Sequence, residues 1–272
     1  MAADPRLSIT EHRPADGSPD APLVVLVHGS LDRAGSFARV TRRLPELHTV
    51  AYDRLGYHRS RDGSPVHTTI AGHVDDLLGL IDGRPAVLVG HSYGGTIALG
   101  AALAAGGPGP VLAVAAYEPP LPWLGTFATR RGGAAGGGPP MTDGDPGAVA
   151  ERFFRRMVGD SAWDRLPDST KAARRADGAA LAAELTAIRS PNPPFDVTLL
   201  PVPVVFGRGS ASLPHHRDAV GWLAAHVPGA HLVEIDGAGH GAHLTHPDAF
   251  AAFVRDGVAL AGPGGYPGAR SG

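Results

Sequence analysis

Short apolar runs alternate along the chain with segments of helical periodicity. Five runs are almost wholly apolar, at residues 23–27, 50–52, 86–89, 111–116 and 202–206, and a sixth at 232–235 contains a glutamate. Continuous apolar runs of this length are typical of strands buried on both faces of a parallel sheet. The pattern therefore predicts a mostly parallel central sheet.

Between the second and third runs, apolar residues recur at helical spacing, at Ile70, Val74, Leu77, Leu78 and Ile81. Thr68 or Thr69 is suited to cap the start of this helix, and Gly83 is suited to close it. Strands that alternate with such helices form βαβ units. The expected fold class is therefore α/β, with helices flanking the sheet.

The alternation stops after residue 120 and resumes near Leu199. The intervening stretch is too long for an ordinary loop, and it contains helical patterns near 148–158 and 171–188. We therefore expect an inserted helical cap.

This pattern divides the chain into a core of residues 1–118 and 200–260 and a cap of residues 119–199. Within the cap, the glycine-rich stretch 132–140 is expected to be mobile. The tail at 261–272 is dominated by glycine, proline and alanine, so we expect it to be disordered.

Charge and composition narrow the range of partners. The formal net charge of -2 lacks the basic excess that nucleic acids or anionic membranes require. Because there are no cysteines, disulfides, thiolate nucleophiles and Cys-ligated zinc sites are excluded. No run approaches 18 apolar residues, and no apolar segment follows a basic stretch at the N-terminus. We expect a cytoplasmic protein that acts on a small molecule and binds neither nucleic acid nor membrane.

The motif that carries chemistry is G-x-S-x-G at residues 90–94, directly after the third apolar run. A serine at the tip of a tight strand-to-helix turn presents its hydroxyl to a carbonyl if its neighbours lack bulky side chains, and Gly90 and Gly94 meet this requirement. The bare motif arises by chance in glycine-rich chains. Here the good helix formers at 96–103 supply the expected context and favour Ser92 as a nucleophile.

Four motifs in this order resemble those of the α/β-hydrolase superfamily: His28-Gly29-Ser30-Leu31, Asp53-Arg54-Leu55-Gly56, the turn at Ser92, and Gly237-Ala238-Gly239-His240. The resemblance covers most of the chain outside the cap and the two ends, and it implies that these loops lie at the carboxyl edge of the sheet. It implies His240 as the general base for Ser92. It also implies an oxyanion hole made by the backbone N–H groups of Tyr93 and Ser30, with Leu31 as the next candidate.

The acid of the catalytic triad departs from the commonest pattern of this family. Relatives usually carry an aspartate in a G-x-x-D arrangement after the strand at 202–206, whereas this chain has Ser210. Glu118 ends the preceding strand, followed by two prolines, at a position from which some relatives supply the acid. We expect Glu118 to orient His240, with Asp218 as the alternative acid. A simpler alternative is that Glu118 pairs with an arginine.

A second departure follows Asp53, where relatives often carry D-x-x-G-x-G-x-S and this chain has His58 at the second glycine. His58 is either a surface substitution or a polar group that reaches the substrate. Large apolar residues of the cap either line a site above Ser92 or form the cap's own core; the candidates for substrate contact are Trp123, Phe127, Phe153, Phe154 and Met157.

No cofactor is expected. The histidines at positions 240, 243 and 246 match no usual zinc spacing, and there is no cysteine or paired carboxylate to complete a ligand set.

The resemblance therefore implies a cofactor-free serine hydrolase that cleaves a carboxylic ester of a small or medium apolar substrate through an acyl-enzyme. Because Ser92 occupies the nucleophile position, aspartate-based dehalogenase and epoxide hydrolase chemistry is excluded. Thioester hydrolysis, carbon–carbon bond hydrolysis and cofactor-free haloperoxidase activity are alternatives on the same triad. A non-hydrolytic binding protein or a lyase is the alternative of another class, favoured by the serine at position 210.

Overall fold

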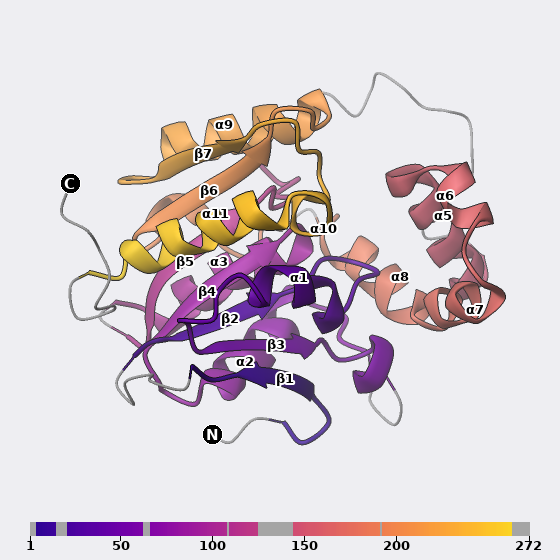
Figure 1. Ribbon diagram of the computed structural model, residues 1–272, viewed down its shortest axis with the longest axis horizontal. Helices are drawn as coiled ribbons and strands as arrows, with labels where there is room; N and C mark the ends of the chain where they lie inside the picture. Colours follow the sequence, from indigo (N-terminus) through magenta and orange to yellow (C-terminus); the bar gives the residue numbers. More distant parts are fainter. Residues whose placement is uncertain are drawn as a thin grey trace.

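A seven-stranded sheet forms the centre of the molecule in the computed structural model, which describes residues 4–14, 21–61, 66–107, 109–124, 144–190 and 192–262. The strand order is β1-β3-β2-β4-β5-β6-β7 (Figure 1). The strands are β1 (Ser8–His12), β2 (Leu23–Val27), β3 (Thr49–Asp53), β4 (Ala86–His91), β5 (Val111–Tyr117), β6 (Val204–Gly209) and β7 (His231–Ile235). β1 pairs antiparallel with β3, and all other neighbours are parallel. The predicted α/β class and mostly parallel sheet are confirmed.

Each of the six apolar runs coincides with a strand, but the run at 202–206 is displaced. β6 begins at Val204, directly after Pro203, because proline has no N–H for the ladder; its carbonyl still accepts from the N–H of Val114 at 3.0 Å. β1 was not predicted. It is an edge strand with a polar sequence whose residues are exposed or half-buried, so no apolar run marks it.

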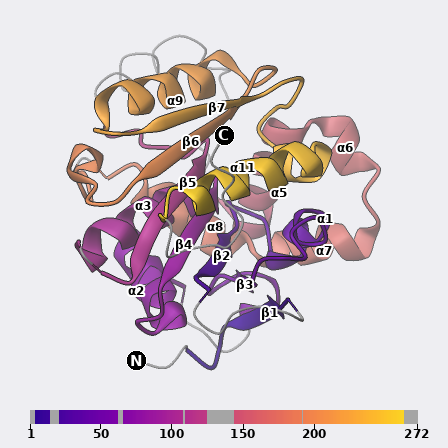
Figure 2. The same cartoon turned by 60° about the vertical axis from the view of Figure 1, so that its left-hand side comes forward.

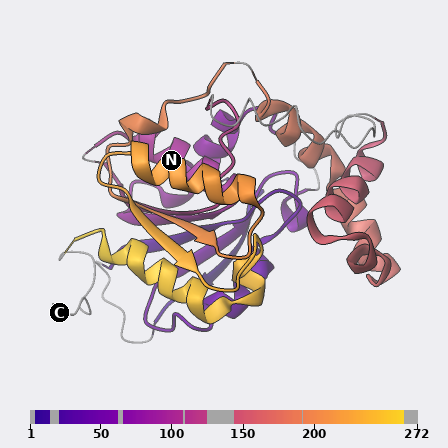
Figure 3. The same ribbon diagram turned by 90° about the horizontal axis from the view of Figure 1, so that it is seen from above.

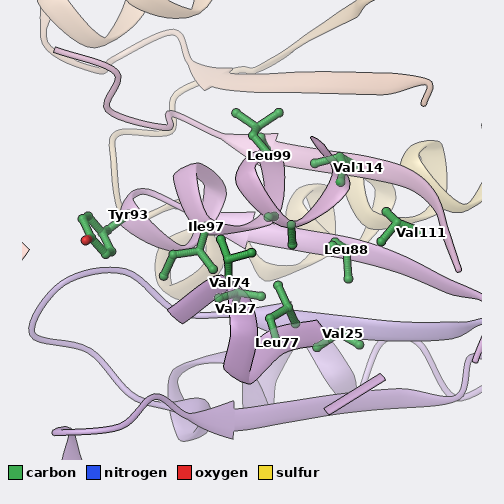
Figure 4. Close-up of a cluster of buried hydrophobic side chains, with 14 of the residues drawn as sticks. Val25, Val27, Val74, Leu77, Leu88, Tyr93, Ile97, Leu99, Val111 and Val114 are labelled. Atoms are coloured by element: carbon green, nitrogen blue, oxygen red, sulfur yellow. The ribbon is translucent and has the colours of Figure 1, made fainter. Parts of the chain in front are cut away.

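Alternate strand residues face opposite sides of the sheet and build two cores. Val25 and Val27 face the core covered by α2 (Ile70–Ile81), α3 (Tyr93–Ala105) and α9 (Pro214–His226), part of which is drawn in Figure 4. Val24 and Leu26 face the core covered by α1 (Ala38–Thr41) and α11 (Pro247–Ala259). Figure 3 shows α9 and α11 on opposite sides of the strands. Burial on both faces accounts for the uninterrupted apolar runs.

Helix α2 begins and ends close to the predicted residues. Thr69 is the N-cap, and its hydroxyl accepts a hydrogen bond from the N–H of Gly72 at 3.3 Å. The helix ends at Asp82, which has a left-handed φ of 48°, and Gly83 follows with φ 74°. The left-handed turn that closes the helix therefore starts one residue before the glycine.

The cap contains α5 (Pro146–Val158), α6 (Asp160–Asp164), α7 (Asp168–Ala176) and α8 (Gly178–Ala187). Figure 1 shows these helices to one side of the sheet, and Figure 2 shows α5, α6 and α7 there from a second direction. The prediction of a single helix over 171–188 was wrong, because this stretch is divided between α7 and α8. A Cβ atom at Gly178 would lie 2.0 Å from the carbonyl oxygen of Pro146, so the junction packs directly against the start of α5. α6 was not predicted.

The remaining short elements are η1 (Ala34–Phe37), η2 (His58–Ser60), η4 (Val197–Leu199) and α10 (Ala242–Thr245). The glycine-rich stretch 132–140 and residues 263–272 of the tail lie outside the described residues. Among the helices that the structure describes, none has the length and apolar character needed to cross a membrane.

Candidate active site

Ser92 lies at the turn between β4 and α3, with φ 52° and ψ −126°. A positive φ is uncommon outside glycine and marks strain of the kind that concentrates at functional sites. Its N–H donates to the carbonyl of Tyr117 at 2.8 Å, and its carbonyl accepts from the N–H of Gly95 at 2.7 Å. The residue is partly exposed at the carboxyl end of β4, as the motif predicts.

The glycines around this turn allow close backbone contacts. A Cβ atom at Gly90 would lie 2.3 Å from the carbonyl oxygen of Gly94, and one at Gly94 would lie 2.1 Å from that of Val27. A Cβ atom at Gly29 would lie 3.0 Å from the Cβ atom of Ser92, so the loop after β2 packs against the serine. The flanking glycines are therefore geometric requirements of the turn.

Glu118 and His240 are in direct contact. Glu118 follows β5 with φ 46°, and its side chain has no solvent exposure. Its Oε2 lies 2.7 Å from Nδ1 of His240, and its Oε1 accepts from the N–H of Gly209 at 2.9 Å. Because Nδ1 binds the carboxylate, Nε2 is the ring nitrogen left to face a substrate or a nucleophile.

The hydrogen bonds of Glu118 decide its charge. Burial alone would raise its pKa, but the interactions with His240, with Ser212 and with the N–H of Gly209 together outweigh burial and hold the pKa below its usual value. The carboxylate is therefore ionised at neutral pH, and it stabilises a positive charge on the imidazole. Among the described residues, no arginine forms an ion pair with Glu118.

The two other positions considered for the acid are occupied differently. Asp218 is exposed on α9. The hydroxyl of Ser210 donates to Oδ1 of Asp236 at 3.0 Å and accepts from the N–H of Gly237 at 2.8 Å. Ser210 thus ties the end of β6 to the loop that carries His240.

Two side chains hold the loop that carries His240. Nε2 of His91 lies 2.7 Å from the carbonyl oxygen of His240, and the hydroxyl of Tyr117 donates to the carbonyl of Gly239 at 2.9 Å. Burial, followed by the neighbouring His243 and His240, lowers the pKa of His91 well below its usual value. A neutral His91 with its proton on Nε2 therefore donates to this carbonyl.

His216 is a neighbour of the pair that sequence analysis missed. Its ring stacks on that of His240 with centroids 4.4 Å apart and 16° between the planes, and its Nδ1 lies 3.9 Å from Oε2 of Glu118. Burial, together with the charge of His240, lowers the pKa of His216 to about 3. His216 is thus a neutral ring over one face of His240. It lies in the first turn of α9, where no local motif marks it.

The loop after β2 contains the residues predicted for the oxyanion hole. Ser30 is partly exposed, and Tyr93 is the buried first residue of α3. In the described part of the chain, no backbone carbonyl accepts from the N–H of either residue, so both remain available to a ligand. Leu31 has φ 54° and is buried against the cap residues Val149 and Leu181.

His58 pairs with a carboxylate. Its Nδ1 lies 2.9 Å from Oδ2 of Asp53, its backbone N–H donates to Oδ1 of Asp177 at 3.1 Å, and its side chain is 32 % exposed. Its φ is 45°, which lies in the left-handed region that favours glycine. The contacts place His58 between the loop after β3 and the cap.

The aromatic cap residues Phe153 and Phe154 pack in one cluster with Leu31. The ring of Phe154 also lies 5.3 Å from that of Trp163. This cluster is part of the cap's own core and reaches the loop beside Ser30.

The other candidates for substrate contact are dispersed. Trp123 packs against the core that α2, α3 and α9 cover, and the centroid of its ring lies 5.3 Å from that of Phe195. Met157 is 39 % exposed near the end of α5. Phe127 lies outside the described residues.

Within the described ranges, three groups of side chains bring three metal-ligating atoms within 4.8 Å of one another: Asp32, His91 and His243; His67, His73 and Asp76; and Glu118, His216 and His240. In the last group the two rings are nearly parallel, so their in-plane lone pairs cannot converge on one ion. Direct contacts account for the others, at 3.3 Å between His243 and Asp32 and 2.7 Å between His67 and Asp76. We assign no metal role to these groups.

The model of the Alpha/beta hydrolase family matches residues 24–253. The chain belongs to this family. The hydrolase is also similar to Lipase LipV of Mycobacterium tuberculosis, with 37 % identity over 105 residues. That match covers 37 % of this chain and 39 % of the lipase.

Among solved structures, the hydrolase resembles the enol-lactonase from Burkholderia xenovorans, with a TM-score of 0.65 and 22 % identity over 92 % of this chain and 95 % of that one. It also resembles a thermophilic esterase from Thermogutta terrifontis, with a TM-score of 0.67 and 19 % identity over 92 % of each chain. At these identities the likeness establishes the fold.

Proposed function

We propose that this hydrolase cleaves carboxylic esters through an acyl-enzyme on Ser92, with His240 as the base and Glu118 as the acid. The observation that carries the proposal is the contact of 2.7 Å between a buried, ionised carboxylate and Nδ1 of His240, in a loop held against β4 and β5. This contact fixes the tautomer in which Nε2 accepts a proton.

In this mechanism, Oγ of Ser92 attacks the carbonyl carbon while Nε2 of His240 takes its proton. The N–H groups of Ser30 and Tyr93 stabilise the oxyanion of the tetrahedral intermediate. His240 returns the proton to the leaving alcohol, and the serine ester remains. Water then attacks this ester, again with His240 as the base, and the carboxylic acid is released.

The relatives support an ester as the bond cleaved. The similar proteins include a lipase, an esterase and an enol-lactonase. A lactone is a cyclic ester, so the same steps open it without a separate leaving group. Small or medium apolar acyl esters and lactones are therefore the substrates to assay first.

Turnover of p-nitrophenyl esters tests the proposal. We expect Ser92→Ala to reduce kcat by at least about 10³-fold, because triad members act as a unit and the alanine removes the nucleophile without a change in core packing. Ser190→Ala, an exposed serine at the end of the cap, is the control and should retain full activity. If Ser92→Ala turned over esters near the wild-type rate, the serine mechanism would be wrong.

A further inference from the structure

An ion pair in the interior connects the core to the cap. Arg54 directly follows β3, and its guanidinium binds the carboxylate of Glu184 on α8. The two side chains are 0 % and 1 % exposed. Burial of two charges carries a desolvation cost, and apolar residues of similar volume often give equal or greater stability. Folding stability is therefore a weak explanation for the presence of this ion pair. The other contacts of Arg54 and Glu184 indicate a different role.

Arg54 also binds the loop predicted to form the oxyanion hole. Its Nε donates to the carbonyl of His28 at 3.0 Å, and its Nη2 donates to the carbonyl of Gly29 at 3.0 Å. In a planar trans peptide, the carbonyl and the N–H point in opposite directions. Because the Gly29 carbonyl points toward Arg54, the N–H of Ser30 in the same peptide unit points away from it.

His28 reinforces this arrangement. The backbone N–H of Arg54 donates to Nε2 of His28 at 3.0 Å, and Nδ1 of His28 lies 2.8 Å from the carbonyl oxygen of Gly29. Burial, followed by the charge of Arg54, lowers the pKa of His28 to about 3, so the ring is neutral. With Nε2 as an acceptor, Nδ1 carries the proton and donates to the Gly29 carbonyl. Two donors thus orient this one peptide unit.

Glu184 extends the network to Ser30 itself. The hydroxyl of Ser30 donates to Oε2 of Glu184 at 2.7 Å, while Oε1 binds Arg54. One carboxylate from the cap therefore bridges the residue whose N–H faces the oxyanion and the arginine that orients its peptide. The bridge spans 154 positions in sequence between Ser30 and Glu184.

The charges in this network are balanced. A lone carboxylate so close to the oxyanion hole would oppose the negative charge of the tetrahedral intermediate. Arg54 offsets it, and its Cζ lies 5.2 Å from the ring of Tyr93, the residue that carries the second predicted donor. His73 lies 3.6 Å from Oε1 of Glu184, but burial lowers its pKa well below its usual value, so it adds no charge.

We infer that Glu184 is a positioning residue for the oxyanion hole, acting through Ser30 and Arg54. Stabilisation of the transition state then depends on the cap helix α8 being seated on the core. The inference rests on the proposed function, because it assigns the N–H of Ser30 to the oxyanion.

The first test is Ser30→Ala, which retains the backbone N–H and removes only the link to Glu184. We expect kcat for p-nitrophenyl esters to fall about 10-fold with KM within about twofold, since a displaced donor weakens the transition state and not the bound substrate. The affinity of an alkyl boronic acid, which forms a tetrahedral adduct with Ser92, should fall by the same factor as kcat/KM. Thr186→Ala is the matched control on α8, because its exposed hydroxyl donates to the carbonyl of Ala182 within the same helix.

A second variant separates positioning from stability. The double variant Arg54→Leu/Glu184→Leu replaces both charges with apolar side chains and leaves no unpaired charge in the interior, so we expect it to fold, and its melting temperature measures any loss of stability. Its kcat should nevertheless fall at least as far as that of Ser30→Ala.

The inference is overturned if Ser30→Ala and a folded double variant both keep wild-type kcat and boronate affinity. Failure of the proposed function has a different signature, because the wild-type enzyme itself would then neither turn over esters nor bind the boronic acid.

Discussion

At the scale of single residues, the carboxylate beside His240 comes from the end of β5 and not from the loop after β6. Glu118 is fully buried, and it binds both Nδ1 of His240 and the N–H of Gly209. Ser210, where the sequence resemblance led us to look for an aspartate, joins two loops through Asp236 and Gly237. His240 thus has a buried carboxylate partner although position 210 is a serine.

Glu118→Gln tests this placement. The amide keeps the shape of the side chain but allows the wrong tautomer of His240, so we expect kcat to fall by up to about 10⁴-fold. Asp218→Asn should leave kcat unchanged. Ser210→Asp in the Glu118→Gln background should recover part of the rate. An active Glu118→Gln variant beside a crippled Asp218→Asn variant would place the acid on α9 instead.

Residues marked by local motifs could be predicted from the sequence. Ser92 has its flanking glycines, and the resemblance to the family implied that Glu118 orients His240. His216 and Glu184 lie in no such motif, and the motif that contains Arg54 does not reveal the partners of its side chain. Their roles depend on packing between segments far apart in the sequence, such as the contact of Arg54 with Glu184 across 130 positions.

At the scale of elements, the sequence predicts the strands and helices whose burial gives them a regular apolar pattern. The five inner strands have nearly continuous apolar sequences because helices cover both faces, and α2 has a regular apolar stripe and a capping threonine. β1 could not be predicted because it is an exposed edge strand, with β3 as its one partner in the described sheet. The break between α7 and α8 depends on the tertiary contact of Gly178 with Pro146, which the helical periodicity of 171–188 does not reveal.

At the scale of the whole molecule, several histidines are buried in the neutral form. Burial lowers the pKa of His28 and His216 to about 3 and that of His73 and His91 well below the usual value. In the unfolded chain each would titrate near 6.5, so below that pH the unfolded state binds more protons than the folded state. Stability should therefore fall as the pH falls below about 6.5.

Urea unfolding at pH 7.5 and pH 5.5 measures this effect. Each buried neutral histidine should contribute about 1.4 kcal/mol to the decrease in unfolding free energy over these two pH units. In His216→Phe, the decrease in unfolding free energy between the two pH values should be smaller by the contribution of one histidine. His231→Gln, at an exposed position, should leave the decrease unchanged. An unfolding free energy that is equal at the two pH values would contradict the neutral burial of these rings.

The most direct test of the central claim is the rate and site of labelling by a fluorophosphonate, which reacts with activated serines. Peptide mass spectrometry should find one adduct, on Ser92, that is absent in Ser92→Ala and forms much more slowly in Glu118→Gln. No adduct on the wild-type enzyme, or an adduct that persists in Ser92→Ala, would contradict the assignment of Ser92 as a nucleophile activated by His240 and Glu118.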